Sequence, residues 1–199
     1  MKNAPTDPIP ILRDLIRCKS VTPAEGGALG YLEGLLSARR FICHRLIFRE
    51  EGTPDVDNLF ARFGTGAPHL CFAGHTDVVP EGLVEGWTHP PFAAEISSGF
   101  IYGRGACDMK GSVAAFVAAA LDHLRGAGSF TGSISFLITG DEEGPAINGT
   151  VKVLEWMRAN GHIPDHCIVG EPSSMDSLGD MIKIGRRGSL SFAVAVEGR

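Results

Sequence analysis

The sequence predicts an α/β domain in which a mixed, largely parallel sheet is flanked by helices. Short apolar runs with strand character alternate with segments of helical spacing, an order that is typical of an α/β layered domain. Several of these apolar runs end at a glycine that stands next to an acidic or imidazole side chain. The residues that follow parallel strands meet at one edge of the sheet, so the same pattern predicts a functional site there.

The first quarter of the chain predicts two helices and an edge strand. Asp7 and a following proline can cap and begin a helix that runs to about residue 17. A second helix is expected over 28–39, where leucines recur on one face. The alternation of residues 41–48 ends in charged side chains, which indicates an edge strand.

The next segments lead into the first candidate motif. Strands are expected over 58–63 and 69–73, and the second of these enters Gly-His-Thr-Asp at 74–77. Prolines and glycines predict an ordered loop over 80–92. Residues 95–102 then predict a hairpin that turns at a Ser-Gly pair.

The second half of the chain predicts two helices and two strands. The clearest helix is expected over 111–125, because its apolar residues form one stripe; the opposite face is mostly alanine, which indicates packing on more than one side. A buried strand over 133–139 delivers an acidic cluster, and a helix over 151–160 stops at a glycine. A strand over 166–169 follows. Two further segments are expected to form the arms of a new hairpin, 181–184 and 190–196.

Composition excludes several classes of protein. The chain has 199 residues, 44% of them hydrophobic and 21% charged, which is typical of an ordinary globular protein. The net charge of −5 and the absence of a basic patch argue against nucleic acid as a partner. No apolar run approaches the roughly 18 residues of a membrane span, so no membrane association is expected. The five cysteines are scattered, which favours reduced thiols and a cytoplasmic location.

His75 and Asp77 form the first candidate pair. Residues i and i+2 of a strand face the same way, so both side chains point to one side at the strand's end. One interpretation is a metal-bound imidazole whose second nitrogen is held by a carboxylate. The alternative, left open by so short a motif, is a capped turn in which Asp77 binds backbone amides.

Asp108 stands among three glycines directly before the clearest helix. Glycines at this density indicate unusual backbone dihedrals or a close approach of the backbone to another group. A metal ligand and a plain helix cap both remain open for Asp108. A dinucleotide or phosphate loop is disfavoured, because the third glycine and the Gly-Lys-Ser/Thr ending of such loops are absent.

Glu142 and Glu143 follow Asp141 after a buried strand. Three neighbouring acids repel one another, and without a cation they would cost stability or raise a pKa. Consecutive residues of an extended segment point opposite ways, so one would bind metal while its neighbour faces substrate. A solvated acidic turn is the alternative. Glu171 follows the strand at 166–169, and it becomes a candidate site residue only because the other motifs end strands in the same way.

The remaining histidines are not expected to bind metal. His166 is expected in the core because it lies in a predicted strand, whereas His89 in the loop over 80–92 could face the site. The others are expected at the surface or in loops: His44, His69, His123 and His162.

Taken in order, these motifs resemble the di-zinc metallopeptidase family of aminoacylases, amino-acid deacylases and glutamate carboxypeptidases. The stretches at 72–80 and 102–112 are shared across that family. Gly-Pro-Ala-Ile-Asn-Gly-Thr at 144–150 and Gly-Arg-Arg-Gly-Ser at 185–189 are similar to its members that remove succinyl groups. The resemblance covers nearly the whole chain and implies a zinc-peptidase-like catalytic domain.

The resemblance implies a set of metal ligands. Asp108 would bridge two zinc ions, for which Co²⁺ is a possible substitute. His75 and Glu171 would complete the ligands of one metal, and Glu143 would bind the other. The resemblance also implies a cis peptide bond between Asp108 and Met109.

The resemblance further implies a reaction and the roles of four more residues. Asp77 would orient the histidine ligand, and Glu142 would act as general base. Arg186 or Arg187 would help hold a substrate carboxylate. The substrate would be an N-succinyl amino acid, N-succinyl-LL-2,6-diaminoheptanedioate, which is hydrolysed to succinate and the free diamino acid. Another N-acyl amino acid amidohydrolase of the family is the alternative.

The resemblance also implies a division of the chain. Residues 1–185 would form the catalytic domain, and 186–199 would begin an inserted α+β dimerisation domain that makes the full-length protein a homodimer. The chain stops on an alternation that has just begun, which favours a fragment truncated at its C-terminal side. The family takes one more histidine ligand from a later segment, so an inactive metal-binding fragment is the alternative from another functional class.

Overall fold

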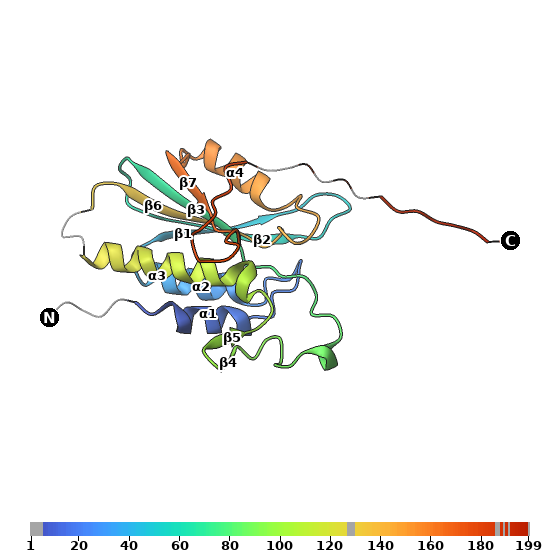
Figure 1. Ribbon diagram of the computed structural model, residues 1–199. Coiled ribbons are helices and arrows are strands. Elements are labelled where there is room, and N and C mark those ends of the chain that lie inside the picture. The colour runs from blue at the N-terminus through green and yellow to red at the C-terminus, as the bar shows by residue number, and fades with distance from the viewer. Residues whose placement is uncertain (1–5, 127–129, 186–187, 189, 191, 199) are drawn as a thin grey trace.

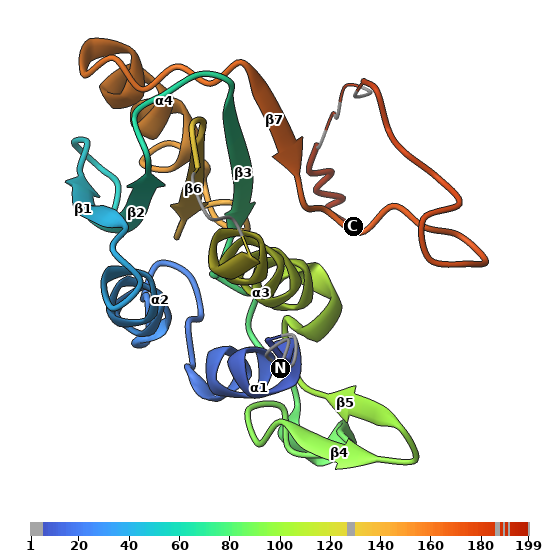
Figure 2. The ribbon, with the colours of Figure 1, turned by 90° about the vertical axis from the view of Figure 1, so that its left-hand side faces the viewer.

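The computed structural model describes residues 6–126, 130–185, 188, 190 and 192–198. Its main sheet has five strands in the order β1-β2-β6-β3-β7, which Figure 2 shows side by side. The strands are β1 (Ile42–Phe48), β2 (Val56–Phe63), β3 (His69–His75), β6 (Ser133–Thr139) and β7 (His166–Val169). β2 pairs antiparallel with β1 and β6, while β3 pairs parallel with β6 and β7. Only β2 therefore runs against the other four, and the predicted mixed, largely parallel sheet is confirmed.

Helices cover both faces of this sheet, as Figure 1 shows. The helices are α1 (Pro8–Arg17), α2 (Ala28–Ser37), α3 (Gly111–Gly126) and α4 (Thr150–Ala159). Helices α2 and α3 contact the sheet on one face with α1 packed against them, and α4 contacts β6 on the other. The predicted start of α1 is confirmed, since the Asp7 side chain accepts a hydrogen bond from the Ile9 backbone N–H at 2.9 Å.

The core has two layers because side chains alternate along the strands. Phe72 and Phe136 lie in the cluster that packs under α1, α2 and α3. Their neighbours Cys71 and Leu137 lie in the cluster that packs under α4. Every residue of β6 is buried, because this strand has neighbours on both sides and helices on both faces.

The hairpin expected at 95–102 is confirmed, whereas the later one is not. β4 (Glu95–Ser97) and β5 (Phe100–Tyr102) pair antiparallel beside α1 in Figure 2. In the described part of the chain beyond Val169, no strand forms, so the expected arms at 181–184 and 190–196 are wrong there. Ile182 and Ile184 are 83% and 101% exposed. A segment of alternating apolar residues forms a strand only where it can pair with a neighbouring strand and pack against a covering layer.

Two histidines lie opposite to expectation. His69 begins β3 and is only 3% exposed, because β3 is an interior strand, whereas His166 lies on the outer strand β7 and is exposed. The His69 ring lies 2.7 Å from the Ser135 hydroxyl and 3.3 Å from the Ile163 carbonyl oxygen. Burial and the nearby Arg62 charge lower the pKa of His69 from its ordinary value of 6.5.

This lowered pKa predicts a loss of stability in mild acid. The folded state binds the His69 proton less readily than the unfolded state, so stability falls as the pH drops below about 6.5 towards the folded pKa. We expect the free energy of unfolding, measured with urea at pH 7.0 and 5.5, to change less with pH in His69→Gln than in the parent protein. Equal pH dependence of the two proteins would contradict a lowered pKa of His69 in the folded state.

Candidate metal centre

Three parallel strands deliver acidic and imidazole side chains to one edge of the sheet. β3 ends at His75, and its parallel neighbour β6 ends two residues before Asp141. On the other side, β3 pairs with β7 through Ala73 and Val169, each of which lies two residues before a candidate ligand. The carboxyl ends of these strands therefore meet, as the sequence predicts.

Asp108 reaches the same edge from the turn before α3. The turn spans Ala106–Lys110, and Asp108 and Met109 have non-helical dihedrals within it. The peptide bond between these two residues is cis, as expected. Gly105 has φ +76°, and a Cβ there would lie 2.5 Å from a Val78 methyl, so only glycine fits this close approach.

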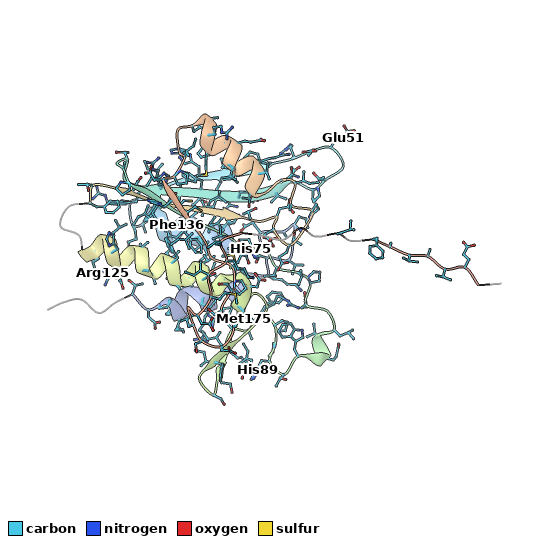
Figure 3. The ribbon with its side chains drawn as sticks, turned by 45° about the horizontal axis from the view of Figure 1, so that its top comes forward. Glu51, His75, His89, Arg125, Phe136 and Met175 are labelled. Atoms are coloured by element: carbon cyan, nitrogen blue, oxygen red, sulfur yellow. The ribbon has the colours of Figure 1, made fainter. Side chains whose placement is uncertain are left out.

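The candidate ligands converge around one buried imidazole. His75 is 1% exposed, and its Nε2 lies 3.1 Å from Asp108 Oδ1, 3.8 Å from Glu171 Oε1 and 4.0 Å from Glu142 Oε2. Figure 3 places His75 in the middle of the molecule, between the sheet and the helices below it.

These side chains form two overlapping groups in which the possible ligand atoms lie within 4.8 Å of one another. The first group is His75, Asp108 and Glu143, and the second is His75, Glu142 and Glu171. Both acids of the Glu142-Glu143 pair therefore reach the cluster. The simple rule that neighbours of an extended segment point opposite ways does not hold here, because the segment is a turn and not a strand.

Asp77 holds two parts of the cluster at once. His75 Nδ1 lies 2.9 Å from the Asp77 backbone oxygen, which can only accept, so Nδ1 carries a hydrogen and Nε2 faces the carboxylates. The Asp77 carboxylate accepts the backbone N–H groups of Glu142 at 3.0 Å and Glu143 at 2.9 Å. The Asp77 side chain therefore binds backbone amides, and its Oδ1 also lies 3.5 Å from His75 Nδ1.

Charge in the cluster is unbalanced. Burial opposes protonation of His75, but hydrogen bonds and charge from Asp77, together with the Glu171 charge, raise its pKa to about 9. Burial and the Asp108 charge raise the pKa of Glu143, and burial raises that of Glu171, although the His75 charge opposes both shifts. Carboxylates crowded in this way favour a divalent cation, and oxygen and imidazole donors suit Zn²⁺ and its neighbours. The residues therefore fit a metal centre.

Two buried charges behind the cluster are not among the predicted site residues. Lys110 is fully buried, its ammonium donates to the Cys18 carbonyl oxygen at 2.9 Å, and burial lowers its pKa to about 8. Asp141 is 3% exposed and belongs to neither group of ligand atoms found among the described residues. The sequence signal for both is their position: Asp141 stands directly before Glu142, and Lys110 stands two residues after Asp108.

Other candidates lie elsewhere. Arg186 and Arg187 fall outside the described residues. His89 does not join the cluster: its Nδ1 lies 2.7 Å from Glu95 Oε2, and its ring stacks on Tyr102 with centroids 4.0 Å apart. Figure 3 shows His89 near the β4–β5 hairpin, well away from His75.

The fold and the acidic cluster define a metallopeptidase-type α/β domain. The profile of peptidase family M20/M25/M40 matches residues 71–197, a span that contains every member of the cluster, and the chain belongs to that family. No helix among the described residues is both long and apolar enough to cross a membrane.

Two curated relatives carry a particular name. The succinyl-diaminopimelate desuccinylase of Rhodopseudomonas palustris (strain BisB18) is 59% identical over all of this chain and 52% of its own length. That of Bradyrhizobium sp. (strain ORS 278) is 60% identical over 98% of this chain and 51% of its own length. The chain thus spans about half the length of these relatives.

Solved structures share the fold at lower sequence identity. An M20 family metallo-carboxypeptidase from Sulfolobus solfataricus has a TM-score of 0.66 at 22% identity, covering 82% of this chain and 37% of its own. Human carnosine dipeptidase 1 has a TM-score of 0.67 at 22% identity, covering 81% of this chain and 38% of its own. These likenesses establish the architecture.

Proposed function

We propose that this protein hydrolyses the amide bond of N-succinyl-LL-2,6-diaminoheptanedioate to give succinate and LL-2,6-diaminoheptanedioate. This reaction belongs to lysine and diaminopimelate biosynthesis in the cytoplasm. The observation that carries the proposal is the convergence of Asp108, Glu142, Glu143 and Glu171 on the Nε2 face of His75. The names of relatives about 60% identical support the choice of substrate.

The cluster would hold two zinc ions, with Co²⁺ as a possible substitute. Asp108 would be shared between them, His75 and Glu171 would complete one ligand set, and Glu143 would belong to the other. When bound, such metals lower the pKa of a coordinated water to near 7 and polarise the substrate carbonyl. Asp77 would keep His75 in the orientation that directs Nε2 to the metal, because it contacts Nδ1 from the other side.

Glu142 is assigned to proton transfer. Its carboxylate is 38% exposed and therefore open to water and substrate, while its backbone N–H is held by the buried Asp77. It would accept a proton from the attacking water and later give that proton to the leaving amine. A carboxylate suits this exchange because it can accept a proton and return it within the same turnover.

Three further assignments belong to this proposal. Arg186 or Arg187 would bind a carboxylate of the substrate. Residues 1–185 would form the catalytic part, and 186–199 would begin a dimerisation domain. The full-length form would then be a homodimer.

The substrate assignment is tested by comparing two substrates. We expect the zinc-loaded protein to hydrolyse N-succinyl-LL-2,6-diaminoheptanedioate with a higher kcat/KM than N-acetylornithine. A higher value for the acetylated substrate would move the assignment to another N-acyl amino acid amidohydrolase. Zinc binding without hydrolysis of either substrate would contradict the proposed activity and favour a metal-binding protein.

The ligand role of Glu143 has its own test. We expect Glu143→Ala to lower the zinc bound per chain, measured by atomic absorption after dialysis, because the group that Glu143 forms with His75 and Asp108 loses a member. Glu155→Ala, an exposed substitution on α4, is the control that should leave zinc content unchanged. Unchanged zinc content in Glu143→Ala would refute the assignment.

A further inference from the structure

The loop between β6 and α4 is wound around a buried carboxylate. The Asp141 side chain accepts backbone N–H groups from Ala146 at 3.1 Å and from Ile147 and Asn148 at 2.9 Å each. The Asp141 backbone N–H donates to the Thr139 hydroxyl at 3.1 Å, so the residue is also tied to the end of β6. Hydrogen bonds to an ionised acceptor are about twice as strong as neutral ones, and three of them close this loop.

Two glycines let the loop pass close to Asp141. A Cβ at Gly144 would lie 2.7 Å from Asp141 Oδ1 and 2.8 Å from the Thr22 hydroxyl. A Cβ at Gly149 would lie 2.5 Å from the Thr139 hydroxyl and 2.8 Å from the Asp141 carbonyl oxygen. A side chain at Gly144 would therefore press on the Asp141 carboxylate, and one at Gly149 would press on the Asp141 backbone.

The far end of the loop is anchored to the β1–β2 connection. The Asn148 side chain donates to the Thr53 hydroxyl at 2.7 Å and to the Pro54 carbonyl oxygen at 2.8 Å. Its backbone oxygen accepts from the Asn58 side chain at 3.0 Å. Because Asn148 also donates its backbone N–H to Asp141, the loop is fixed at both ends.

Glu142 and Glu143 lie between two buried carboxylates. On one side Asp77 accepts both of their backbone N–H groups, and on the other Asp141 holds the loop that continues from them. Both buried carboxylates act on the backbone, and so they determine where the glutamate side chains can reach.

We propose that Asp141 is a positioning residue that holds the Glu142-Glu143 peptide where both carboxylates meet His75. The proposal rests on the proposed metal-dependent function of that cluster. Asp141 acts through the backbone and not as a ligand, which separates its role from those of the other acids. Groups that orient metal ligands in this way change metal affinity by about 10–100-fold when they are replaced.

The test compares two carboxylates that bind backbone N–H groups at opposite ends of the sheet. Asp141→Asn removes the charge and turns an amide donor towards the loop N–H groups. Asp165→Asn is the matched control, because Asp165 accepts the His69 N–H at 2.7 Å where β3 begins, away from the cluster. Zinc affinity is measured by chelator competition, and thermal unfolding of the same samples reports stability.

We expect Asp141→Asn to weaken zinc binding by about 10–100-fold, and Asp165→Asn to lower the unfolding temperature without changing zinc affinity. A folded Asp141→Asn protein that binds zinc as tightly as the parent would overturn the proposal. Equal losses of zinc affinity in both variants would also overturn it, since general loosening would then explain the effect.

A second variant and a metal-free readout complete the test. Gly144→Ala keeps every charge but places a methyl against Asp141, so it should weaken zinc binding as Asp141→Asn does. If Asp141→Asn fails to fold, Gly144→Ala decides the question by the same criterion.

Amide hydrogen exchange of residues 142 and 143 in zinc-free protein should be faster in either variant. Unchanged exchange would reject the positioning role, whereas a parent protein that binds no zinc would reject the proposed function instead.

Discussion

Replacing Glu142 with glutamine is expected to lower kcat of the zinc-loaded protein by about 10²–10⁴-fold while zinc remains bound. Glutamine has nearly the same shape but cannot take a proton from water at neutral pH. The Glu142 backbone N–H would still donate to Asp77, so the neighbouring Glu143 should keep its place. Steady-state turnover of the succinylated substrate and zinc content by atomic absorption are measured on the same samples.

Two outcomes would separate the possible roles of Glu142. Turnover close to that of the parent protein would remove it from the mechanism. A loss of zinc together with turnover would make it a ligand, which its grouping with His75 and Glu171 also permits. Glu155→Gln on the exposed face of α4 is the control for the substitution itself.

Replacing Asp108 with alanine is expected to lower stability strongly with zinc and to change it little without zinc. In the parent protein, zinc at 1,000 times its Kd should raise the free energy of unfolding by about 4 kcal/mol. Asp108→Ala should lose most of this gain, because Asp108 lies closest to His75 Nε2. Without zinc, the variant should stay close to the parent in stability, since the lost contact with His75 Nε2 offsets the relief of Glu143 and Glu171, whose pKa values the Asp108 charge raises.

Urea unfolding of both proteins, with zinc and with chelator, gives the four free energies that are needed. Asp55→Ala is a suitable control, because Asp55 is an exposed acid that pairs with Arg49 at 3.1 Å between β1 and β2. An Asp108→Ala protein that gains as much stability from zinc as the parent does would contradict its place in the metal centre.

Most of the fold and of the cluster follows from local sequence patterns. Strand-like runs that end at a glycine and a charged side chain predicted the convergence of His75 and Glu171, because parallel strands deliver their ends to one edge. The glycine-rich segment before α3 pointed to Asp108, which reaches the same edge from a turn. The cap at Asp7 and the apolar stripe of α3 likewise predicted helices that the structure contains.

The remainder depends on tertiary neighbours that no local pattern specifies. Residues 181–184 alternate like a strand, but they pair with no other strand among the described residues. His69 is buried because β3 lies inside the sheet, and His166 is exposed because β7 lies at its border. The local sequence does not specify this order of strands. Asp141 resembles its two acidic neighbours in sequence, and only the path of the loop turns it inward.

The place of β7 in the sheet has a practical consequence for handling the protein. All four of its residues are exposed, with Ile168 at 49% and Val169 at 62%, and its outer side pairs with no strand among the described residues. An open, apolar border of this kind is a template on which other chains can add backbone hydrogen bonds. The protein should therefore self-associate as its concentration rises, and dilute solutions are the right condition for every titration.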